Sequence, residues 1–528
     1  MNTDHPDQNH SAAHEAHEDF RAAEAEQLGR QWFSQIPVRK PGFWESMVPV
    51  FVLMALLMFS VIIFDDNAAI SATDGPSQIA LLTAGFIAAM LALLQGSRWT
   101  DLEAAVIQSI GYVTQTFLIL ILVGALIGTW ILGGIVPTLV VWGLKILSPD
   151  IFLPASTVIC AVVALATGSS WSTAGTIGIA LIGIGDTMGI NNAMTAGAII
   201  SGSYFGDKMS PFSETTNLAA SMVGTDLFVH IRHMVYTTGP GLVLTLLLFS
   251  LLGLSWSGAS FDSAQVEQVS SAINERFDTS LYILIPMLIL FVMVARQIPA
   301  IPALIVGSVM GVLCAVFFQG PALIHFVNAG TDQAWWQTAV RGSVRAAAAG
   351  FESQSGVAAV DKLLSRGGMV SMLPTVWLIM SAMFFSGIME GSGMLHRIAE
   401  TILSWVHGTG NLVLATIATA IFMNITTSDQ FMSIVIAGRM YKEAYEQEGL
   451  QPWNLSRALE DSGTLTSPLV PWNTCGAFMS QTLGVATISY LPFAFLNLIN
   501  PLISITYGYT GFTMHRIIEQ QPEPESDC

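Results

Sequence analysis

Residues 206–217 read Gly-Asp-Lys-Met-Ser-Pro-Phe-Ser-Glu-Thr-Thr-Asn, a polar stretch with apolar sequence on both sides. It carries Asp207, Lys208 and Glu214, and Pro211 interrupts any helix through it because proline lacks a backbone donor and clashes with the preceding turn. At membrane depth, irregular backbone persists only where it is buried in protein or lines a watery cavity. Ionisable groups at that depth are costly and mark functional sites. The stretch therefore predicts a binding site inside a membrane protein.

The composition agrees with a membrane setting. The 528 residues are 52% hydrophobic and only 11% charged, with a mean hydropathy of +0.60, whereas soluble domains carry about 25% charged residues. Recurrent apolar runs are long enough to span a bilayer as helices. The net charge of −18 lies largely in the tails and polar loops, so we interpret it as solvation and expect no nucleic-acid partner. The four cysteines show neither disulfide nor metal-ligand spacing: Cys160, Cys314, Cys475 and Cys528.

The chain divides into five predicted segments. A polar stretch at 255–280 separates two apolar halves, and both chain ends are polar. The histidines of the first segment could bind metal or sense pH, but their spacing matches no ordered site, and we favour a solvated tail. The segments are an acidic, His-containing cytoplasmic tail (1–43), a first transmembrane repeat (44–254), an external linker (255–280), a second transmembrane repeat (281–514) and a cytoplasmic C-terminal tail (515–528).

The distribution of lysine and arginine predicts the orientation. Arg39 and Lys40 precede the first apolar span, acidic residues follow it, and Arg516 follows the last span. Because basic residues concentrate on the cytoplasmic side, we expect a multi-pass protein of the cytoplasmic (inner) membrane with both termini in the cytoplasm. The region 334–367 is basic but should be external, and we interpret it as amphipathic or buried. No cleavable signal peptide is expected, because the first 40 residues lack an apolar core.

The two halves repeat each other. Ser210-Pro211 has a counterpart in Ser467-Pro468, each preceded by glycine and followed by an amide–hydroxyl pair, and Gly168-Ser-Ser170 aligns with Thr426-Thr-Ser428 at nearly the same spacing. Because the charge rule places the start of the second half outside, the repeat is predicted to be inverted. Transporters with inverted repeats bind their substrates near the midplane, on discontinuous helices.

The predicted fold is an all-α polytopic membrane protein with two inverted repeats. Each repeat has about five transmembrane helices, one helix broken at the midplane, and one re-entrant hairpin. The hairpin tips would lie at Gly168–Thr173 and Thr426–Asp429, and the breaks at Gly206–Asn217 and Gly463–Thr474. The two tips and the two breaks would meet at the centre.

These four segments are rich in oxygen-bearing side chains. A dehydrated monovalent cation needs several hard oxygen ligands, and no His/Cys cluster suited to a transition metal accompanies them. Sodium is therefore the expected ion, with Li⁺ as an alternative, and we expect no cofactor. The candidate ligands are Ser169, Ser170, Thr173, Ser210, Thr215, Thr216, Asn217, Thr427, Ser428, Ser467, Asn473 and Thr474. The candidate proton- and ion-coupling carboxylates are Asp207, Glu214, Asp429 and Asp461.

Each candidate also has a structural alternative. Serine and threonine in membrane helices commonly bond to their own backbone, and Asn217 and Asn473 could cap half-helices. Asp207 could form an ion pair with neighbouring Lys208. Asp461 lies beside Glu460, which suits a pair of acids at a helix entrance. A carboxylate that binds both Na⁺ and H⁺ in a low-dielectric cavity would make the two ions compete, which is sufficient for antiport when the site faces either side in turn.

The motifs resemble the NhaC family of Na⁺/H⁺ antiporters over roughly residues 45–515. The resemblance lies in Thr167-Gly-Ser-Ser-Trp-Ser-Thr-Ala-Gly-Thr176, Gly202–Asn217, Thr427-Ser-Asp429 and Ser467-Pro-Leu-Val-Pro-Trp-Asn-Thr474. It implies Na⁺/H⁺ exchange by alternating access, with an elevator-like movement and paired sodium sites. Ser169, Ser170, Thr216 and Asn217 would match the first site, and Thr427, Ser428, Asn473 and Thr474 the second.

The alternative function is Na⁺- or H⁺-coupled exchange of an organic solute, of the malate/lactate or amino-acid type, because similar exchangers share these motifs. A serine hydrolase is disfavoured, since a nucleophilic serine needs an adjacent base and the four segments contain no histidine. A channel is disfavoured because broken helices in an inverted repeat suit alternating access. The expected partners are the lipid bilayer, Na⁺ and H⁺, and a homodimer is left open.

Overall fold

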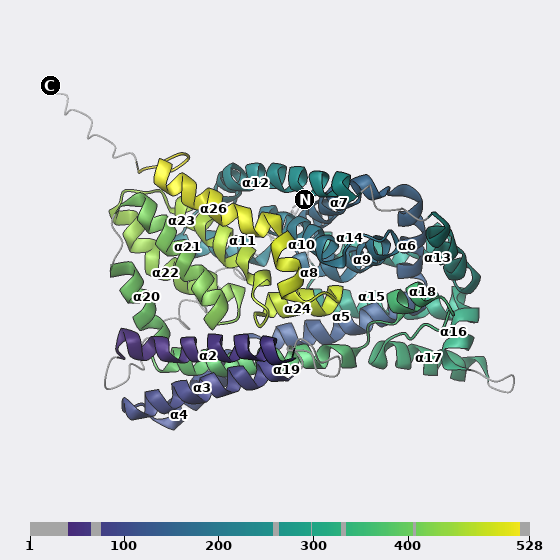
Figure 1. The fold of residues 1–528 in the computed structure, drawn as a ribbon, viewed down its shortest axis with the longest axis horizontal. Coiled ribbons are helices and arrows are strands. Elements are labelled where there is room, and N and C mark those ends of the chain that lie inside the picture. The colour runs from purple at the N-terminus through teal and green to yellow at the C-terminus, as the bar shows by residue number, and fades with distance from the viewer. Residues whose placement is uncertain are drawn as a thin grey trace, which may run out of the picture.

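The computed structural model describes residues 41–64, 75–256, 263–296, 298–328, 334–404 and 408–517 (Figure 1). Within these ranges the protein is helical, and the only strand-like pairings are two isolated bridges, Phe351 with Arg366 and Leu450 with Arg516. Eight helices are long and apolar enough to cross a membrane, or up to ten if each of two sharply bent helix pairs counts as one span. The all-α polytopic fold is thus confirmed. The predicted histidine tail lies outside the described residues.

The helices of the first half follow the predicted apolar segments, with short helices between them. They are α2 (Phe43–Phe64), α3 (Pro76–Leu94), α4 (Trp99–Tyr112), α5 (Thr114–Leu132), α6 (Ile135–Ile146), α7 (Pro149–Thr167), α8 (Ser170–Thr173), the π-helix η1 (Ala174–Gly178), α9 (Ile179–Thr187), α10 (Asn192–Met209), α11 (Glu214–Val223) and α12 (Leu227–Trp256). The segment predicted as a linker, 255–280, contains α13 (Ser263–Arg276).

The helices of the second half follow in a similar order. They are the 3₁₀-helix η2 (Leu281–Leu284), α14 (Ile285–Ala295), α15 (Ala300–Phe318), α16 (Gly320–Val327), α17 (Trp335–Ala349), α18 (Ala358–Leu364), η3 (Met369–Met372), α19 (Leu373–Gly391), α20 (Met394–Ser404), α21 (Thr409–Thr426), α22 (Gln430–Gln447), α23 (Pro452–Leu459), the π-helix η4 (Glu460–Thr464), η5 (Ser467–Leu469), α24 (Thr474–Leu483), α25 (Thr487–Tyr490), η6 (Leu491–Phe493) and α26 (Phe495–Thr510).

The half-helices that follow the two breaks resemble each other. The half-helices after the two breaks, α11 and α24, are both ten residues long, and both end on a left-handed glycine, Gly224 with φ 77° and Gly484 with φ 68°. Each half-helix also packs against the other half of the chain. The first-half helix α11 packs against α22, and the second-half helix α24 packs against η1 and α9. This packing brings the site-bearing segments of both halves together. The opposite orientation of the two halves stays a prediction.

Small residues set the distance between α7 and α10. A Cβ atom on Gly202 would lie 2.1 Å from the carbonyl oxygen of Thr157, and one on Gly206 would lie 2.4 Å from that of Ala161. Glycines spaced in this way allow membrane helices to approach closely. The contact holds the first tip, which follows α7, against the first break, which follows α10. Both segments lie toward the middle of the molecule in Figure 1.

Candidate functional site

Both predicted tips are short interruptions between helices. The first tip begins at Gly168, whose left-handed backbone (φ 69°) ends α7. The side chain of Ser169 then caps α8 by accepting a hydrogen bond from the amide of Ser172. The second contains Ser428, a non-glycine residue with φ 59°, and Asp429 caps α22. A left-handed serine stores backbone strain, which is common at ligand sites. Because α7 and α21 are long enough to cross a membrane, re-entry of the two hairpins stays a prediction.

The first tip and the first break meet at Asp207. One carboxylate oxygen accepts hydrogen bonds from Ser170, from the backbone amide at 3.1 Å and from the hydroxyl at 2.6 Å. The other oxygen accepts the hydroxyl of Ser213 at 2.7 Å, and that hydroxyl lies 3.0 Å from the Thr215 hydroxyl. All four residues are buried. Four side-chain oxygen groups thus converge from α8, α10 and α11.

The second tip and the second break meet at Asp429. One of its oxygens accepts the amides of Phe431 and Met432 at 2.9 and 3.1 Å, and the other accepts the Thr474 hydroxyl at 3.4 Å. The Thr474 amide donates to the Ser428 carbonyl at 2.9 Å. The Ser428 hydroxyl is buried and has no hydrogen-bond partner among the described residues. It is available as a further oxygen ligand.

The two halves also contact each other directly at these segments. Lys208, at the end of α10, forms an ion pair with Asp461 in η4, and both side chains are fully buried. The same Asp461 oxygen accepts Thr237 at 3.2 Å and Asn500 at 3.3 Å. The predicted alternative, in which Lys208 pairs with neighbouring Asp207, is wrong. The lysine instead reaches across to the second half.

Glu460 is a candidate that the sequence did not single out. The structural alternative for Glu460 and Asp461 was a pair of acids at a helix entrance, but both side chains are fully buried in the π-helix η4. Neither oxygen of Glu460 has a hydrogen-bond partner among the described residues, and the Oδ2 atom of Asp461 also has none. Glu460 lies within electrostatic range of Lys208, Asp207 and Asp461. Two adjacent acids at a Gly-containing turn were the signal that could have identified it, since π-turns often mark functional sites.

Glu214 differs from these buried carboxylates in its exposure. Its side chain is exposed, in the first turn of α11, where a carboxylate is favoured by the helix dipole. The role of Glu214 in ion coupling stays a prediction.

The other predicted ligands mostly hydrogen-bond to nearby backbone groups. The hydroxyl of Ser210 accepts the amide of Phe212, and that of Ser467 donates to Thr464. A hydroxyl that donates to a carbonyl keeps its lone pairs for a cation. The remaining donors and their backbone acceptors are Thr173 to Ser169, Thr216 to Lys208, Asn217 to Pro211, Thr427 to Met423 and Asn473 to Asn424.

Within the described ranges, no three His, Cys, Asp or Glu side chains gather as transition-metal ligands would. A small cavity lies beside the first tip, lined among others by Thr167, Trp171, Ser172 and Thr176, with a volume of about 20 Å³. The Trp171 ring stacks on Phe478 of α24 with centroids 4.3 Å apart. A cavity of this size holds about one water-sized particle.

Comparison with known proteins identifies the family. The profile of a family described as the Na⁺/H⁺ antiporter family matches residues 202–512, which include both breaks and the second tip. An Na⁺/H⁺ antiporter NhaC of Alkalihalophilus pseudofirmus is 37% identical, over 87% of this chain and 94% of its own. The chain belongs to the Na⁺/H⁺ antiporter family. This confirms the resemblance to NhaC proteins.

Other relatives of this antiporter-family chain differ in the solutes that their names record. A malate-2H⁺/Na⁺-lactate antiporter of Bacillus subtilis is 37% identical over 90% of this chain and 96% of its own. An arginine/ornithine antiporter, ArcD of Halobacterium salinarum, is 32% identical over 93% and 97%. The family is thus one of secondary antiporters, and identity alone does not separate the named substrates.

Proposed function

We propose that this antiporter exchanges Na⁺ for H⁺ by alternating access. The observation that carries the proposal is the imbalance of buried charge around Lys208. Glu460 lies within electrostatic range of Asp207, Asp461 and Lys208, and the three carboxylates are buried. Two buried cations accompany them, Lys208 in the ion pair with Asp461 and Arg457 within electrostatic range of Asp461. A buried charge is costly unless a partner compensates it. Because two cations cannot compensate three carboxylates, the cluster has to take up protons or cations.

In this scheme Na⁺ and H⁺ bind at neighbouring positions. Asp207, Ser170, Ser213 and Thr215 would supply oxygen ligands for one Na⁺, and Asp429, Ser428 and Thr474 would supply them for a second. Glu460, which has no hydrogen-bond partner among the described residues, would carry the proton. Because Lys208 and Glu460 come from different halves, relative movement of the halves would change the electrostatic environment of both ions. An elevator-like movement and paired sodium sites are part of the proposal.

The alternative is exchange of an organic anion or amino acid, and the names of two relatives favour it. One observation supports the small cations instead. Lys208 is fully buried and already paired with Asp461, so it is not available to a substrate carboxylate. We also propose that the protein lies in the cytoplasmic membrane with both termini in the cytoplasm.

Everted membrane vesicles with an acid interior test this function. Addition of Na⁺ alone should dissipate the pH gradient, and malate, lactate, arginine or ornithine should add nothing. Asp207→Asn should abolish the Na⁺ response. Asp101→Asn is the matched control, because Asp101 is an exposed carboxylate paired with Arg98 on α4. A response that requires one of the organic solutes would replace cation exchange with solute exchange.

A further inference from the structure

The helix α17 leaves one face uncovered. Thr338, Ala339, Gly342 and Ala346 lie on its buried face, which packs against α5. The other side exposes an apolar stripe at four-residue spacing, in which Trp336 is 66%, Val340 54% and Val344 61% exposed. Side chains four residues apart on a helix lie one above another. The stripe therefore forms a continuous apolar strip along α17.

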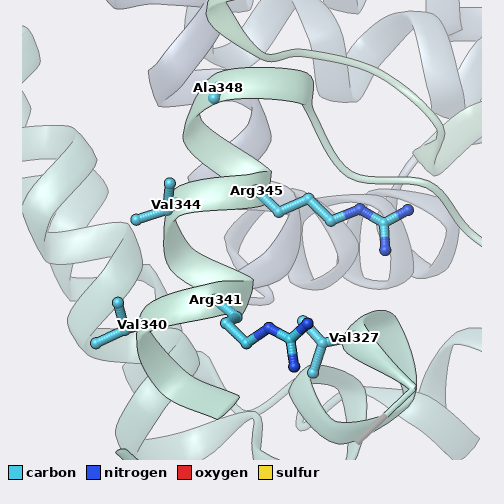
Figure 2. Close-up of a pocket in the computed structure, with 6 residues that line it drawn as sticks. All are labelled: Val327, Val340, Arg341, Val344, Arg345 and Ala348. Carbon is cyan, nitrogen blue, oxygen red and sulfur yellow. The ribbon is translucent and has the colours of Figure 1, made fainter. Parts of the chain in front are cut away.

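A groove follows this strip, between α17 and the end of α16. Its volume is about 430 Å³, and it is lined by Val327, Val340, Arg341, Val344, Arg345 and Ala348. Figure 2 shows Arg341 and Arg345 projecting in parallel from one side of α17, and Val340 and Val344 from the other side. The groove thus joins an apolar wall to a basic wall, as an amphipathic ligand requires.

The two arginines differ in their partners. Arg345 is fixed in place, since it donates to the Phe326 carbonyl at 3.0 Å, lies 4.7 Å from the centroid of the Phe326 ring and pairs with Glu352 at 3.2 Å. Arg341 is exposed and makes no ion pair or side-chain hydrogen bond to any residue that the structure describes. Figure 2 shows its guanidinium group beside Val327. Arg341 therefore presents uncompensated positive charge next to apolar surface.

We propose that this groove binds an anionic phospholipid. The phosphate would accept hydrogen bonds from Arg341, whose planar fork matches phosphate oxygens, and an acyl chain would lie along Trp336, Val340 and Val344. Tryptophan at a membrane–water interface anchors a helix at headgroup level, and basic groups there attract anionic lipids. A soluble anion would use the arginines but leave the two valines in water. The combination of charge and apolar strip favours a lipid.

Native mass spectrometry of the detergent-purified protein tests the site. Wild type and Arg341→Gln are mixed with phosphatidylglycerol or with phosphatidylcholine of the same acyl chains, and retained lipids are counted. Wild type should retain phosphatidylglycerol preferentially, and the variant should bind it at least about fivefold more weakly. Its retention of phosphatidylcholine should not change. Val344→Ser should weaken the binding of both lipids without altering the preference for phosphatidylglycerol.

Arg296→Gln is the matched control, because Arg296 is also exposed and has no ion pair among the described residues. It should retain both lipids as wild type does. Equal retention of phosphatidylglycerol by wild type and Arg341→Gln would overturn the proposal. Displacement of the lipid by millimolar inorganic phosphate would show a soluble-anion site instead. Efficient disulfide cross-linking of Val344→Cys between two copies would assign the face to a dimer interface.

Discussion

Replacement of Lys208 by methionine should destabilise the protein strongly. The lysine pairs with Asp461, and both side chains have no exposed surface. Methionine preserves most of the unbranched chain but removes the charge, so Asp461 is left buried without its cation. Breaking a buried ion pair from one side costs about 3–5 kcal/mol. Thr237 and Asn500 already donate to Asp461 in the wild type, so their hydrogen bonds cannot offset the loss.

The double variant Lys208→Met, Asp461→Asn should recover most of this stability. It removes both partners of the ion pair together, and the asparagine oxygen still accepts hydrogen bonds from Thr237 and Asn500. The remaining deficit should be about 1 kcal/mol, the difference between hydrogen bonds to a carboxylate and to an amide. Asp461→Asn alone should also be destabilised, because it leaves the ammonium of Lys208 buried and unpaired.

Thermal unfolding of the protein in detergent, followed with a thiol-reactive dye, measures this prediction. The described cysteines Cys160, Cys314 and Cys475 are free and buried, so the dye reacts as the protein unfolds. Lys208→Met should melt well below wild type, and the double variant between them. If the double variant melts no higher than Lys208→Met, the reasoning about the ion pair is refuted. Exchange by a stable double variant at the wild-type rate would show that the pair is only structural.

Three further variants test other parts of the site. Glu460→Gln mimics the protonated carboxyl permanently, so its melting temperature should equal or exceed that of wild type. Na⁺-driven proton exchange in vesicles should fall by more than about tenfold, because the side chain can no longer release a proton. Unchanged exchange would exclude Glu460 as the proton carrier. Gly202→Ala would place a Cβ atom 2.1 Å from the Thr157 carbonyl oxygen. It should therefore lower the free energy of unfolding by about 3 kcal/mol or more, and lower the yield of monodisperse protein. Gly111→Ala is the control, because nothing lies within 4 Å of the added Cβ atom. It should change neither the stability nor the yield. Glu214→Gln should retain the Na⁺-driven exchange that Asp207→Asn loses, since Glu214 is exposed. Total loss of exchange would return Glu214 to the ion site.

Local chemistry made the breaks and tips predictable from the sequence. Pro211 and Pro468 cannot continue a helix, and Gly168 suits the left-handed conformation that ends α7. Apolar runs predicted spanning helices, and eight described helices are long and apolar enough to cross a membrane. The short helices α4, α6 and α20 were missed, because they carry too few apolar residues in a row to appear as spans.

Long-range pairing was not predictable in the same way. Lys208 and Asp461 are 253 residues apart, and nothing in either segment indicates which residue the other will face. Glu214 was expected at the centre because it lies in the motif without a basic neighbour. The rotation of α11 decides its position, and that rotation places Thr215 and Thr216 inside and Glu214 outside. The face that a short half-helix buries depends on its tertiary partners, here α22.

The asymmetry between the halves bears on how ions could be coupled. The repeat aligns Thr464 of the second break with Asp207 of the first. The two breaks therefore share Ser-Pro and an amide–hydroxyl pair but differ in their charged side chains. If each half bound ions independently, each would need its own complete set of charged groups. Instead the first half supplies Asp207 and Lys208, the second supplies Glu460 and Asp461, and the ion pair between Lys208 and Asp461 joins them. In the proposed mechanism, movement of one half would change the energy of charges in the other. A single shared charge cluster would then couple the uptake of one ion to the release of the other, and two separate symmetric sites would not.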